Sequence, residues 1–388
     1  MFRFLTAGES HGKGLVVVVE GLPAGISLSE ADIAFELKRR QGGYGRGARM
    51  QIERDHAEIL SGVRHGLTIG SPISLLIQNR DWQNWQEVMS VAPAEEPVLS
   101  GVEGTIDPVT RLRPGHADLP GVTKYNLDDI RPILERASAR ETAGRVAVGA
   151  VARKFLQGFD IEIHSHVIAI GGCRARHYDS IDWEKVEASP VRCADAVAER
   201  QMIAAIDAAR EGGDSVGGVF EVVATGVPIG LGSHIQWDRR LDGRIAQAMM
   251  SIHAVKGVEI GAGFALADLR GSEAQDVIEP GLRRPTNRAG GIEGGMTNGQ
   301  PLVVRAAVKP IATIAKPLAS VDLRTGEKVL AHFERADICI VPAAGIIGEA
   351  MLAMVLAGAF LEKFGGDHIE ETSRNYRGYR EQVNARFG

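Results

Sequence analysis

The order of apolar and polar residues along the chain predicts a protein of mixed α and β structure. Short β-branched runs, typical of strands, lie at 15–20, 161–169, 216–223, 302–308 and 338–341. Apolar residues that recur every three or four positions, typical of helices, lie at 30–40, 127–137, 141–158, 197–210, 244–252 and 343–364. Segment 52–77 is predicted as short strands and turns, 79–112 as a long polar surface excursion, and 173–189 as a loop.

Two of the predicted helices carry signals at their N-termini. Ser29, followed three residues later by Asp32, is typical of a capping box. Ser138 is predicted as an N-cap ahead of helix 141–158, where backbone N–H groups would attract an anion or a flavin ring oxygen. The first helix closes on Lys38, Arg39 and Arg40, which suits the negative end of the helix dipole.

A short motif occurs twice in the chain. A β-branched run is followed by Gly-x-Pro-x-Gly at 21–25 and again at 226–230. The recurrence predicts an internal duplication in which two similar halves share one core. Residues 1–388 are therefore predicted to form a single domain.

The composition narrows the class of protein. With 388 residues, 44% of them apolar, the chain can bury a sizeable core, and its formal net charge of −5 provides no basic field for nucleic acid. Cys173, Cys193 and Cys339 form neither a disulfide framework nor a metal pattern, which fits a reducing cytoplasm. The start of the chain has no long apolar signal region, and the uncharged run Ala350–Leu361 is too short to span a membrane. We therefore expect a cytoplasmic protein with no metal site, membrane anchor or nucleic-acid partner.

The candidate chemistry concentrates in Arg111–Arg145, which contains six arginines together with His116. Arginine presents a planar fork of donors that matches carboxylate and phosphate, and histidine exchanges a proton near neutral pH. The segment therefore suggests a site for a small, highly anionic molecule with proton transfer nearby. The alternative is a solvated surface of charge pairs, because the acids Glu135 and Glu141 are interleaved with the arginines.

Two glycine-rich loops extend this candidate site. The loop 8–14 lacks the spacing of a phosphate-binding Walker motif and is a turn by default, but His11 within it is sterically open, as a proton donor must be. The loop 40–49 combines four glycines with Arg40, Arg46 and Arg49. An RNA-binding Arg-Gly segment is one interpretation; a loop that wraps phosphates or carboxylates fits an acidic chain better.

Taken together, the motifs at 8–13, 113–118, 136–142, 294–300 and 335–337 closely resemble the chorismate synthase family. The resemblance runs almost from the first residue to the tail and keeps the order of the motifs. It implies an α+β fold, a β-α-β sandwich with helices packed between antiparallel sheets, assembled as a homotetramer. It also implies conversion of 5-enolpyruvylshikimate 3-phosphate to chorismate and phosphate by anti 1,4-elimination, which needs reduced FMN without net redox change.

The resemblance also assigns roles to individual residues. His11 would protonate the departing phosphate, His116 would be the acid near flavin N1, and Asp337 would accept the proton from flavin N5. Contacts to the flavin are expected from Arg136, Ala137, Ser138, His253, Ala254, Gly294, Lys309, Pro310, Ile311, Ala312, Thr313 and Arg335. Contacts to the substrate are expected from Arg40, Arg46, Arg49, Arg113, Arg140 and Arg335.

Some details depart from the family or extend it. His253 occupies a position where many members carry Asn or Pro, and we expect its backbone to meet the cofactor. Arg40 and Arg46 would also meet NADPH in members that bind this nucleotide. Because the chain shows no separate reductase domain, an external flavin reductase is the expected source of reduced flavin.

Two rival functions remain at this stage. The first is an ordinary flavin-dependent oxidoreductase that acts on a small anionic substrate and would consume a reductant stoichiometrically. The second is a non-enzymatic RNA-binding protein that uses 39–49. Anaerobic assay separates the first from the lyase, and RNA binding at physiological salt tests the second.

Overall fold

The structure is a computed structural model that describes residues 2–47, 55–93, 108–178, 180–316, 318–334 and 336–387. Its first sheet is antiparallel and four-stranded, with the order β1-β2-β6-β3. The strands are β1 (Arg3–Ala7), β2 (Gly14–Glu20), β3 (Ala57–Ser61) and β6 (Ile73–Gln78), and a small hairpin of β4 (Val63–Arg64) and β5 (Leu67–Thr68) precedes β6. Strand alternation sends Leu15, Val17 and Val19 of β2 into the core.

The second sheet is antiparallel and five-stranded, with the order β10-β13-β9-β7-β8. Its strands are β7 (Glu162–Ile170), β8 (Cys173–Arg174), β9 (Gly218–Thr225), β10 (Val255–Ile260) and β13 (Leu302–Val308). Two small hairpins join β11 (Ile292–Glu293) to β12 (Met296–Thr297) and β14 (Ala319–Val321) to β15 (Lys328–Leu330).

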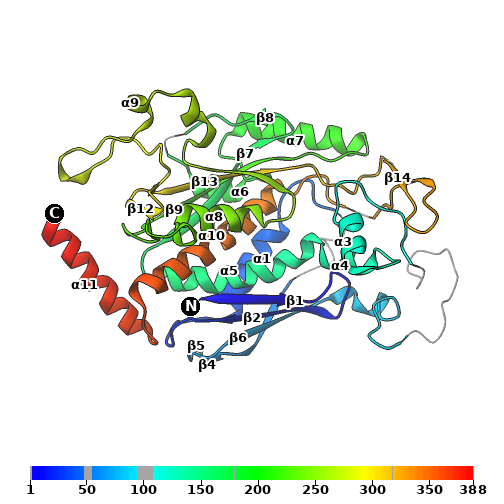
Figure 1. Ribbon diagram of the computed structural model, residues 1–388, viewed down its shortest axis with the longest axis horizontal. Coiled ribbons are helices and arrows are strands. Elements are labelled where there is room, and N and C mark those ends of the chain that lie inside the picture. The colour runs from blue at the N-terminus through cyan, green and yellow to red at the C-terminus, as the bar shows by residue number, and fades with distance from the viewer. Residues whose placement is uncertain are drawn as a thin grey trace.

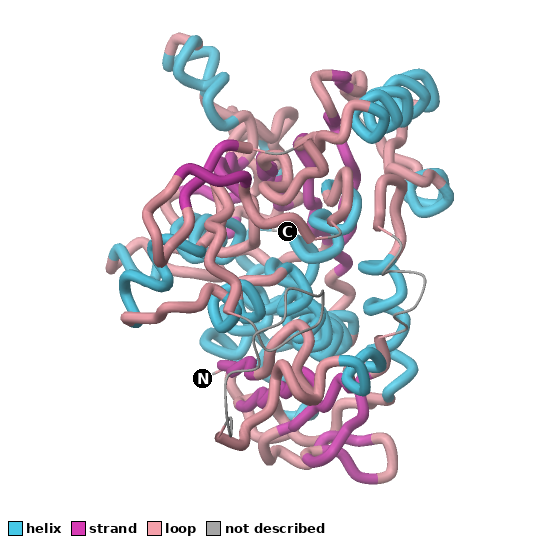
Figure 2. Tube along the Cα trace, turned by 90° about the vertical axis from the view of Figure 1, so that its right-hand side faces the viewer, coloured by secondary structure: helices cyan, strands magenta, loops and turns pink. Residues whose placement is uncertain are grey.

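Helices fill the layer between the two sheets, in the views of both Figure 1 and Figure 2. They are α1 (Glu30–Gln41), α5 (Thr142–Gln157), α8 (Leu241–Met250) and α10 (Val341–Phe364). Gly149 lets α5 and α10 approach closely, because a Cβ at this position would lie 2.2 Å from the Cβ of Ala350. The predicted β-α-β sandwich with antiparallel outer sheets is confirmed.

The remaining helices lie around this sandwich. The α-helices are α3 (Asp118–Tyr125), α4 (Arg131–Arg136), α6 (Trp183–Ala188), α7 (Ala196–Glu211), α9 (Gly271–Ala274) and α11 (Ile369–Phe387). The 3-10 helices are η1 (Arg80–Asn84), η2 (Ala139–Glu141), η3 (Trp237–Arg239), η4 (Gly263–Asp268) and η5 (Pro280–Leu282). In Figure 1, α3 and α4 lie at the end of the sandwich opposite α11.

Helix α10 is the central helix of the fold. Among the described residues it is the one helix long and apolar enough to cross a membrane by length and composition, yet 83% of its most apolar window is buried inside the protein. It packs against α5, α8 and α1 and against β7 and β9. Its apolar character therefore matches a core helix covered on all sides, as predicted for Ala350–Leu361.

The two halves of the chain repeat the same topology, which confirms the predicted internal duplication. The strand order β1-β2-β6-β3 of the first sheet corresponds to β7-β9-β13-β10 of the second. In each half one threonine makes three hydrogen bonds to the Gly-x-Pro-x-Gly segment. Its carbonyl accepts from the backbone N–H of the last glycine, and its hydroxyl donates to the proline carbonyl. Its hydroxyl oxygen also accepts from the backbone N–H of the residue that follows the motif. These contacts join Thr68 to Gly25, Pro23 and Ile26 at 2.8, 2.7 and 2.9 Å, and Thr297 to Gly230, Pro228 and Leu231 at 2.8, 2.6 and 2.8 Å.

Three local predictions differ from the structure. The predicted loop 173–189 contains α6, whose N-cap Asp182 accepts from the backbone N–H of Lys185. The predicted strand 338–341 is not a strand; it leads into α10, where Pro342 in the first turn favours a helix start. The predicted helix 127–137 is shortened to α4, again with a proline in its first turn.

Candidate active site

A cavity of about 720 Å³ lies at the N-terminal ends of α5 and α10. Residues from both halves of the chain line it. Those of the first half begin at the 8–14 turn, and those of the second half begin at the end of α8. Its lining includes Ser10, His11, Arg40, Arg46, Arg113, His116, Ala137, Ser138, Ala139, Arg140, His253, Ala254, Lys309, Pro310, Ile311, Ala312, Thr313, Glu334 and Asp337. Most of the predicted site residues are therefore brought together, although they are spread over more than three hundred positions.

The backbone around the cavity favours anions. Ser138 is the N-cap of the short turn η2, where its side chain accepts from the backbone N–H of Arg140, and not of the long helix as predicted, since the N-cap of α5 is Glu141. The turn η2 leads directly into α5, and Asp337 and Ile340 lie just ahead of α10. Helix N-termini carry partial positive charge and unpaired N–H groups, so two long helices direct favourable dipoles toward this space.

His11 is held in place by a buried carboxylate. Its Nδ1 lies 2.9 Å from both carboxylate oxygens of Glu135, and its backbone N–H donates to Glu135 Oε2 at 2.8 Å. The Trp85 ring stacks on the imidazole with a centroid distance of 3.8 Å. These contacts fix the ring at the cavity wall, which suits a proton donor.

His116 is held by a second buried carboxylate. Its Nδ1 lies 2.6 Å from Asp118 Oδ1, and Arg113 grips both oxygens of Asp118 through Nε and Nη2 at 2.8 and 2.9 Å. Burial alone would raise the pKa of the Asp118 carboxyl, but the hydrogen bonds from Arg113 and His116 outweigh it and hold this pKa below its ordinary value. Asp118 therefore stays ionised and orients the side chains of both Arg113 and His116.

The arginines of the cavity are buried and preorganised. Arg40 and Arg140 share the buried carboxylate of Asp55, at 3.4 and 2.8 Å, and Arg40 also donates to Thr142 Oγ1 and to a backbone carbonyl. Arg46 lies 3.1 Å from Asp337, whose other oxygen accepts from the backbone N–H of Gly47 at 2.6 Å. Within Arg111–Arg145, the alternative of a solvated surface is wrong for Arg113 and Arg140, whose side chains are only 5% exposed.

The second half of the chain contributes small and apolar residues with few charges. The loop 309–313 follows β13, and Arg113 Nη1 donates to Thr313 Oγ1 at 3.3 Å across the cavity. His253 Nδ1 is buried and has no hydrogen-bond partner among the described residues. Burial lowers the pKa of His253 below its ordinary value, which favours the neutral imidazole.

Two of the described site residues, Arg136 and Gly294, do not line this cavity. The Arg136 guanidinium donates to the carbonyls of Thr6 and Gly8 and lines a neighbouring cavity of about 430 Å³, which borders the main one at His253. Gly294 lies in the turn between β11 and β12, a region that Figure 1 shows at the end of the sandwich away from α3 and α4. Arg49 and Arg335 lie outside the described residues.

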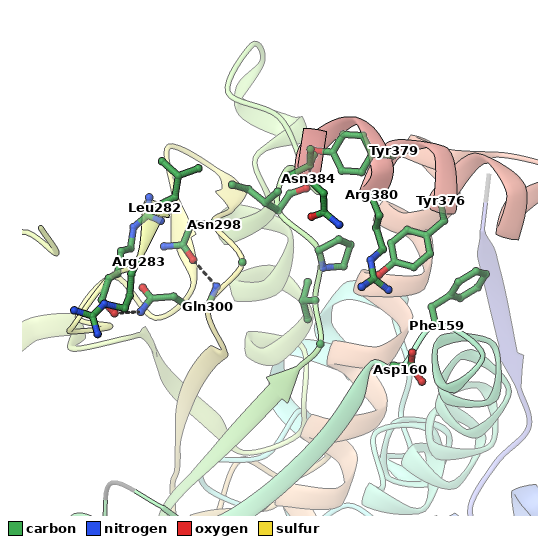
Figure 3. Close-up of a pocket in the computed structure, with 17 residues that line it drawn as sticks. Phe159, Asp160, Leu282, Arg283, Asn298, Gln300, Tyr376, Tyr379, Arg380 and Asn384 are labelled. Atoms are coloured by element: carbon green, nitrogen blue, oxygen red, sulfur yellow. Dashed lines mark hydrogen bonds between the residues drawn. The ribbon is translucent and has the colours of Figure 1, made fainter. Parts of the chain in front are cut away.

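Another cavity, of about 680 Å³, lies beside the C-terminal helix. Figure 3 shows Tyr376 and Arg380 of α11 on one side of it and Asn298 and Gln300 on the other. None of the predicted site residues lines it. We therefore assign the predicted chemistry to the cavity at α5 and α10 and not to this one.

The sequence did not reveal the carboxylates that hold the catalytic candidates. Glu135 was noted only as an interleaved acid, although its spacing of four from Arg131 places both on one face of α4. Asp55 and Trp85 carried no signal, because their partners in the fold lie far away along the chain.

Buried arginines and two carboxylate-bound histidines define an enzyme site for a small polyanion with acid catalysis. Comparison with known proteins names the family: the chorismate synthase family matches residues 2–361. Chorismate synthases of Moorella thermoacetica and Thermobifida fusca are 58% and 54% identical, over 99% and 98% of this chain and 100% and 98% of their own lengths. A solved structure titled Crystal Structure of Chorismate Synthase has a TM-score of 0.78 and 46% identity, covering 99% of this chain and 98% of that one. The chain belongs to the chorismate synthase family.

Proposed function

We propose that the cavity at the N-termini of α5 and α10 is the active site in which this chain carries out the reaction of its family. In this reaction 5-enolpyruvylshikimate 3-phosphate loses phosphate and a hydrogen by anti 1,4-elimination to give chorismate, which makes the enzyme a carbon–oxygen lyase. The observation that carries the proposal is the convergence of His11, His116 and four buried arginines on one cavity.

The substrate of this reaction has two carboxylates and a phosphate, and the cavity offers matching cations. Arg40, Arg46, Arg113 and Arg140 line it, and Arg49 and Arg335 belong to adjoining segments of the chain. Each described arginine is already oriented by a carboxylate, so binding an anion requires little reorganisation. Bidentate guanidinium contacts then fix the substrate's register.

The residues present also fit reduced FMN. A cavity of about 720 Å³ has the size of a small-molecule site. Its wall has small side chains at Ala137, Ala254 and Ala312, where a flat ring can approach the backbone, and the unpartnered Nδ1 of His253 is available to a polar ring edge. Reduced flavin, when bound, supplies the electron that assists loss of phosphate and is recovered at the end of the turnover.

The proton transfers fall to side chains of this chain. His11 would give a proton to an oxygen of the departing phosphate, and His116 would be the acid near flavin N1. Asp337, which contacts Arg46 and the backbone N–H of Gly47, would accept the proton from flavin N5. Each transfer is worth about 10²–10⁴-fold in rate.

Further partners follow from the same proposal. Arg40 and Arg46 would contact NADPH if the chain binds this nucleotide, and otherwise an external flavin reductase would supply reduced flavin. We propose the homotetramer that the family resemblance implies; the position of Gly294 outside the cavity of its own chain fits an assembly in which another copy brings this residue to the flavin. A cytoplasmic location is supported by three cysteines without disulfide bonds.

Anaerobic turnover tests the proposal. The purified chain is incubated with 5-enolpyruvylshikimate 3-phosphate and photoreduced FMN, and chorismate is followed by absorbance. Many turnovers per reduced flavin support the lyase, whereas one reductant consumed per product identifies the rival flavin oxidoreductase. His11→Ala and His116→Ala should each lose at least about tenfold in rate while keeping flavin affinity; normal rates in both would refute the acid assignment.

A further inference from the structure

Glu135 is the side chain nearest to the proposed acid His11 that no motif predicts. It contacts this residue at both carboxylate oxygens and at the backbone N–H, and its own carbonyl accepts from Ser10 N–H at 3.1 Å. The 8–14 turn is therefore attached to the end of α4 by a set of contacts centred on one residue. The turn is also held by Asn79, whose Nδ2 donates to the carbonyls of Ser10 and Gly12 at 3.1 and 3.0 Å, but Glu135 is the carboxylate that contacts the imidazole of His11.

The surroundings of the Glu135 carboxyl make His11 its main partner. The Glu135 side chain is fully buried, with 0% exposure. Arg131 also contacts Glu135 but lies farther away at 3.5 Å; it bonds Glu334 as well, and its guanidinium lies over the Trp85 ring. A buried carboxyl needs hydrogen-bond partners, and the backbone N–H and Nδ1 of His11 supply them at 2.8 and 2.9 Å.

The second histidine provides an internal comparison. Asp118, which holds His116, accepts hydrogen bonds from both Nε and Nη2 of Arg113, so its charge is compensated by the arginine. Glu135 has no such bidentate partner among the described residues. The two carboxylates therefore have different roles. Asp118 orients an arginine and a histidine together, whereas Glu135 mainly orients His11.

We infer that Glu135 is the positioning residue for the acid His11. It receives the Nδ1–H of the imidazolium and keeps the Nε2–H, on the opposite side of the ring, directed at the reacting phosphate. In the step, the Nε2–H bond breaks, an O–H bond forms on the departing phosphate and the imidazole becomes neutral. Trp85 limits rotation of the ring by stacking on its face. This inference rests on the role proposed for His11 in the elimination.

A double-mutant cycle tests the inference. Glu135→Gln, His11→Ala and the double variant are assayed anaerobically with excess reduced FMN. Glutamine keeps the shape and an acceptor oxygen but removes the charge. We expect Glu135→Gln to lower kcat by about 10–100-fold with substrate KM changed less than about threefold. We expect the double variant to be no slower than His11→Ala, because a residue that acts through His11 has nothing left to act on.

Controls separate a structural effect from a positioning effect. Glu221→Gln changes a buried glutamate that also contacts a histidine, His166, at 3.0 Å on the far sheet, and it should keep wild-type kcat. If Glu135→Gln does not fold, Glu135→Asp retains the charge and should recover measurable activity through a longer contact. The inference is overturned if Glu135→Gln keeps wild-type kcat, or if it slows the His11→Ala enzyme further. A wild-type rate in His11→Ala would instead refute the role of His11 itself.

Discussion

Replacing Glu349 with glutamine should destabilise the fold more than any surface substitution. Glu349 lies on α10 and is completely buried. Its carboxylate accepts from Arg39 at 2.7 and 3.0 Å, from Arg153 at 2.7 Å and from Ser165 Oγ at 2.7 Å, and Arg192 lies 3.4 Å away. The cluster joins α1, α5, α10 and β7, the elements that hold the cavity residues in register.

The pKa of Glu349 sets the expected magnitude. Burial would raise this pKa, but the charges of Arg153 and Arg39 outweigh burial and lower it from 4.5 to about 2. At about 1.4 kcal/mol per pKa unit, the ionised cluster contributes about 3 kcal/mol to the free energy of unfolding. A glutamine leaves three guanidinium groups without their shared anion, and breaking a buried ion pair costs about 3–5 kcal/mol.

The pH dependence has a definite sign. Because the folded-state pKa is depressed, the stabilisation is complete above the unfolded pKa of 4.5 and is lost as the pH falls from there through about 2. Urea denaturation followed by circular dichroism should show Glu349→Gln less stable by about 3 kcal/mol at pH 7. The difference from wild type should shrink below pH 4.5.

A matched control lies on the same helix. Glu362 pairs with Arg239 and Arg244 at the surface, with its side chain 40% exposed, so Glu362→Gln should cost less than about 1 kcal/mol. A loss below about 1 kcal/mol in Glu349→Gln at pH 7, equal to that of the control, would show that the buried cluster does not stabilise the fold.

Three further substitutions probe the helix contact and the anion loop. Gly149→Ala would place a Cβ 2.2 Å from that of Ala350, so urea denaturation should show a loss of at least about 1–3 kcal/mol from overpacking. Tyr44→Phe removes a hydroxyl that donates to Asp207 at 2.8 Å and steadies the 42–47 loop; steady-state kinetics should show substrate KM raised about tenfold with kcat little changed. Arg49→Ala should raise substrate KM strongly in the same assay, since an anion in the cavity would lose a partner, and an unchanged KM would place this residue outside the site.

Local sequence signals predicted the elements that depend on local physics. The capping box at Ser29 and Asp32 forms as predicted, and all the β-branched runs except 338–341 become strands, namely β2, β7, β9 and β13. The outer glycines of the repeated Gly-x-Pro-x-Gly motif all adopt positive φ, a backbone conformation that favours glycine. These features are fixed within a few residues of the chain, so a single sequence is enough to find them.

Contacts between distant residues could not be predicted in this way. Arg39 was interpreted as a helix-end charge, yet it is buried against Glu349, 310 positions away. Glu135 and His11 are separated by 124 positions, and nothing in the periodicity of either segment indicates that they meet. Burial decides whether a charged residue is a solvated surface group or a structural ion, and burial is a property of the folded chain.

The duplicated scaffold explains why the active site is asymmetric. Equivalent positions of the two halves meet at the cavity, since α1 follows the first Gly-x-Pro-x-Gly motif and α8 follows the second. The end of α1 delivers Arg40, whereas the end of α8 delivers His253 and Ala254. The first half therefore supplies the described guanidinium groups for a polyanion, whereas the second supplies Ala254 and the 309–313 loop for a flat ring, together with the charges of Lys309 and Asp337. A symmetric site could not do both, because a second set of arginines in place of Ala254 would fill the space and repel the first.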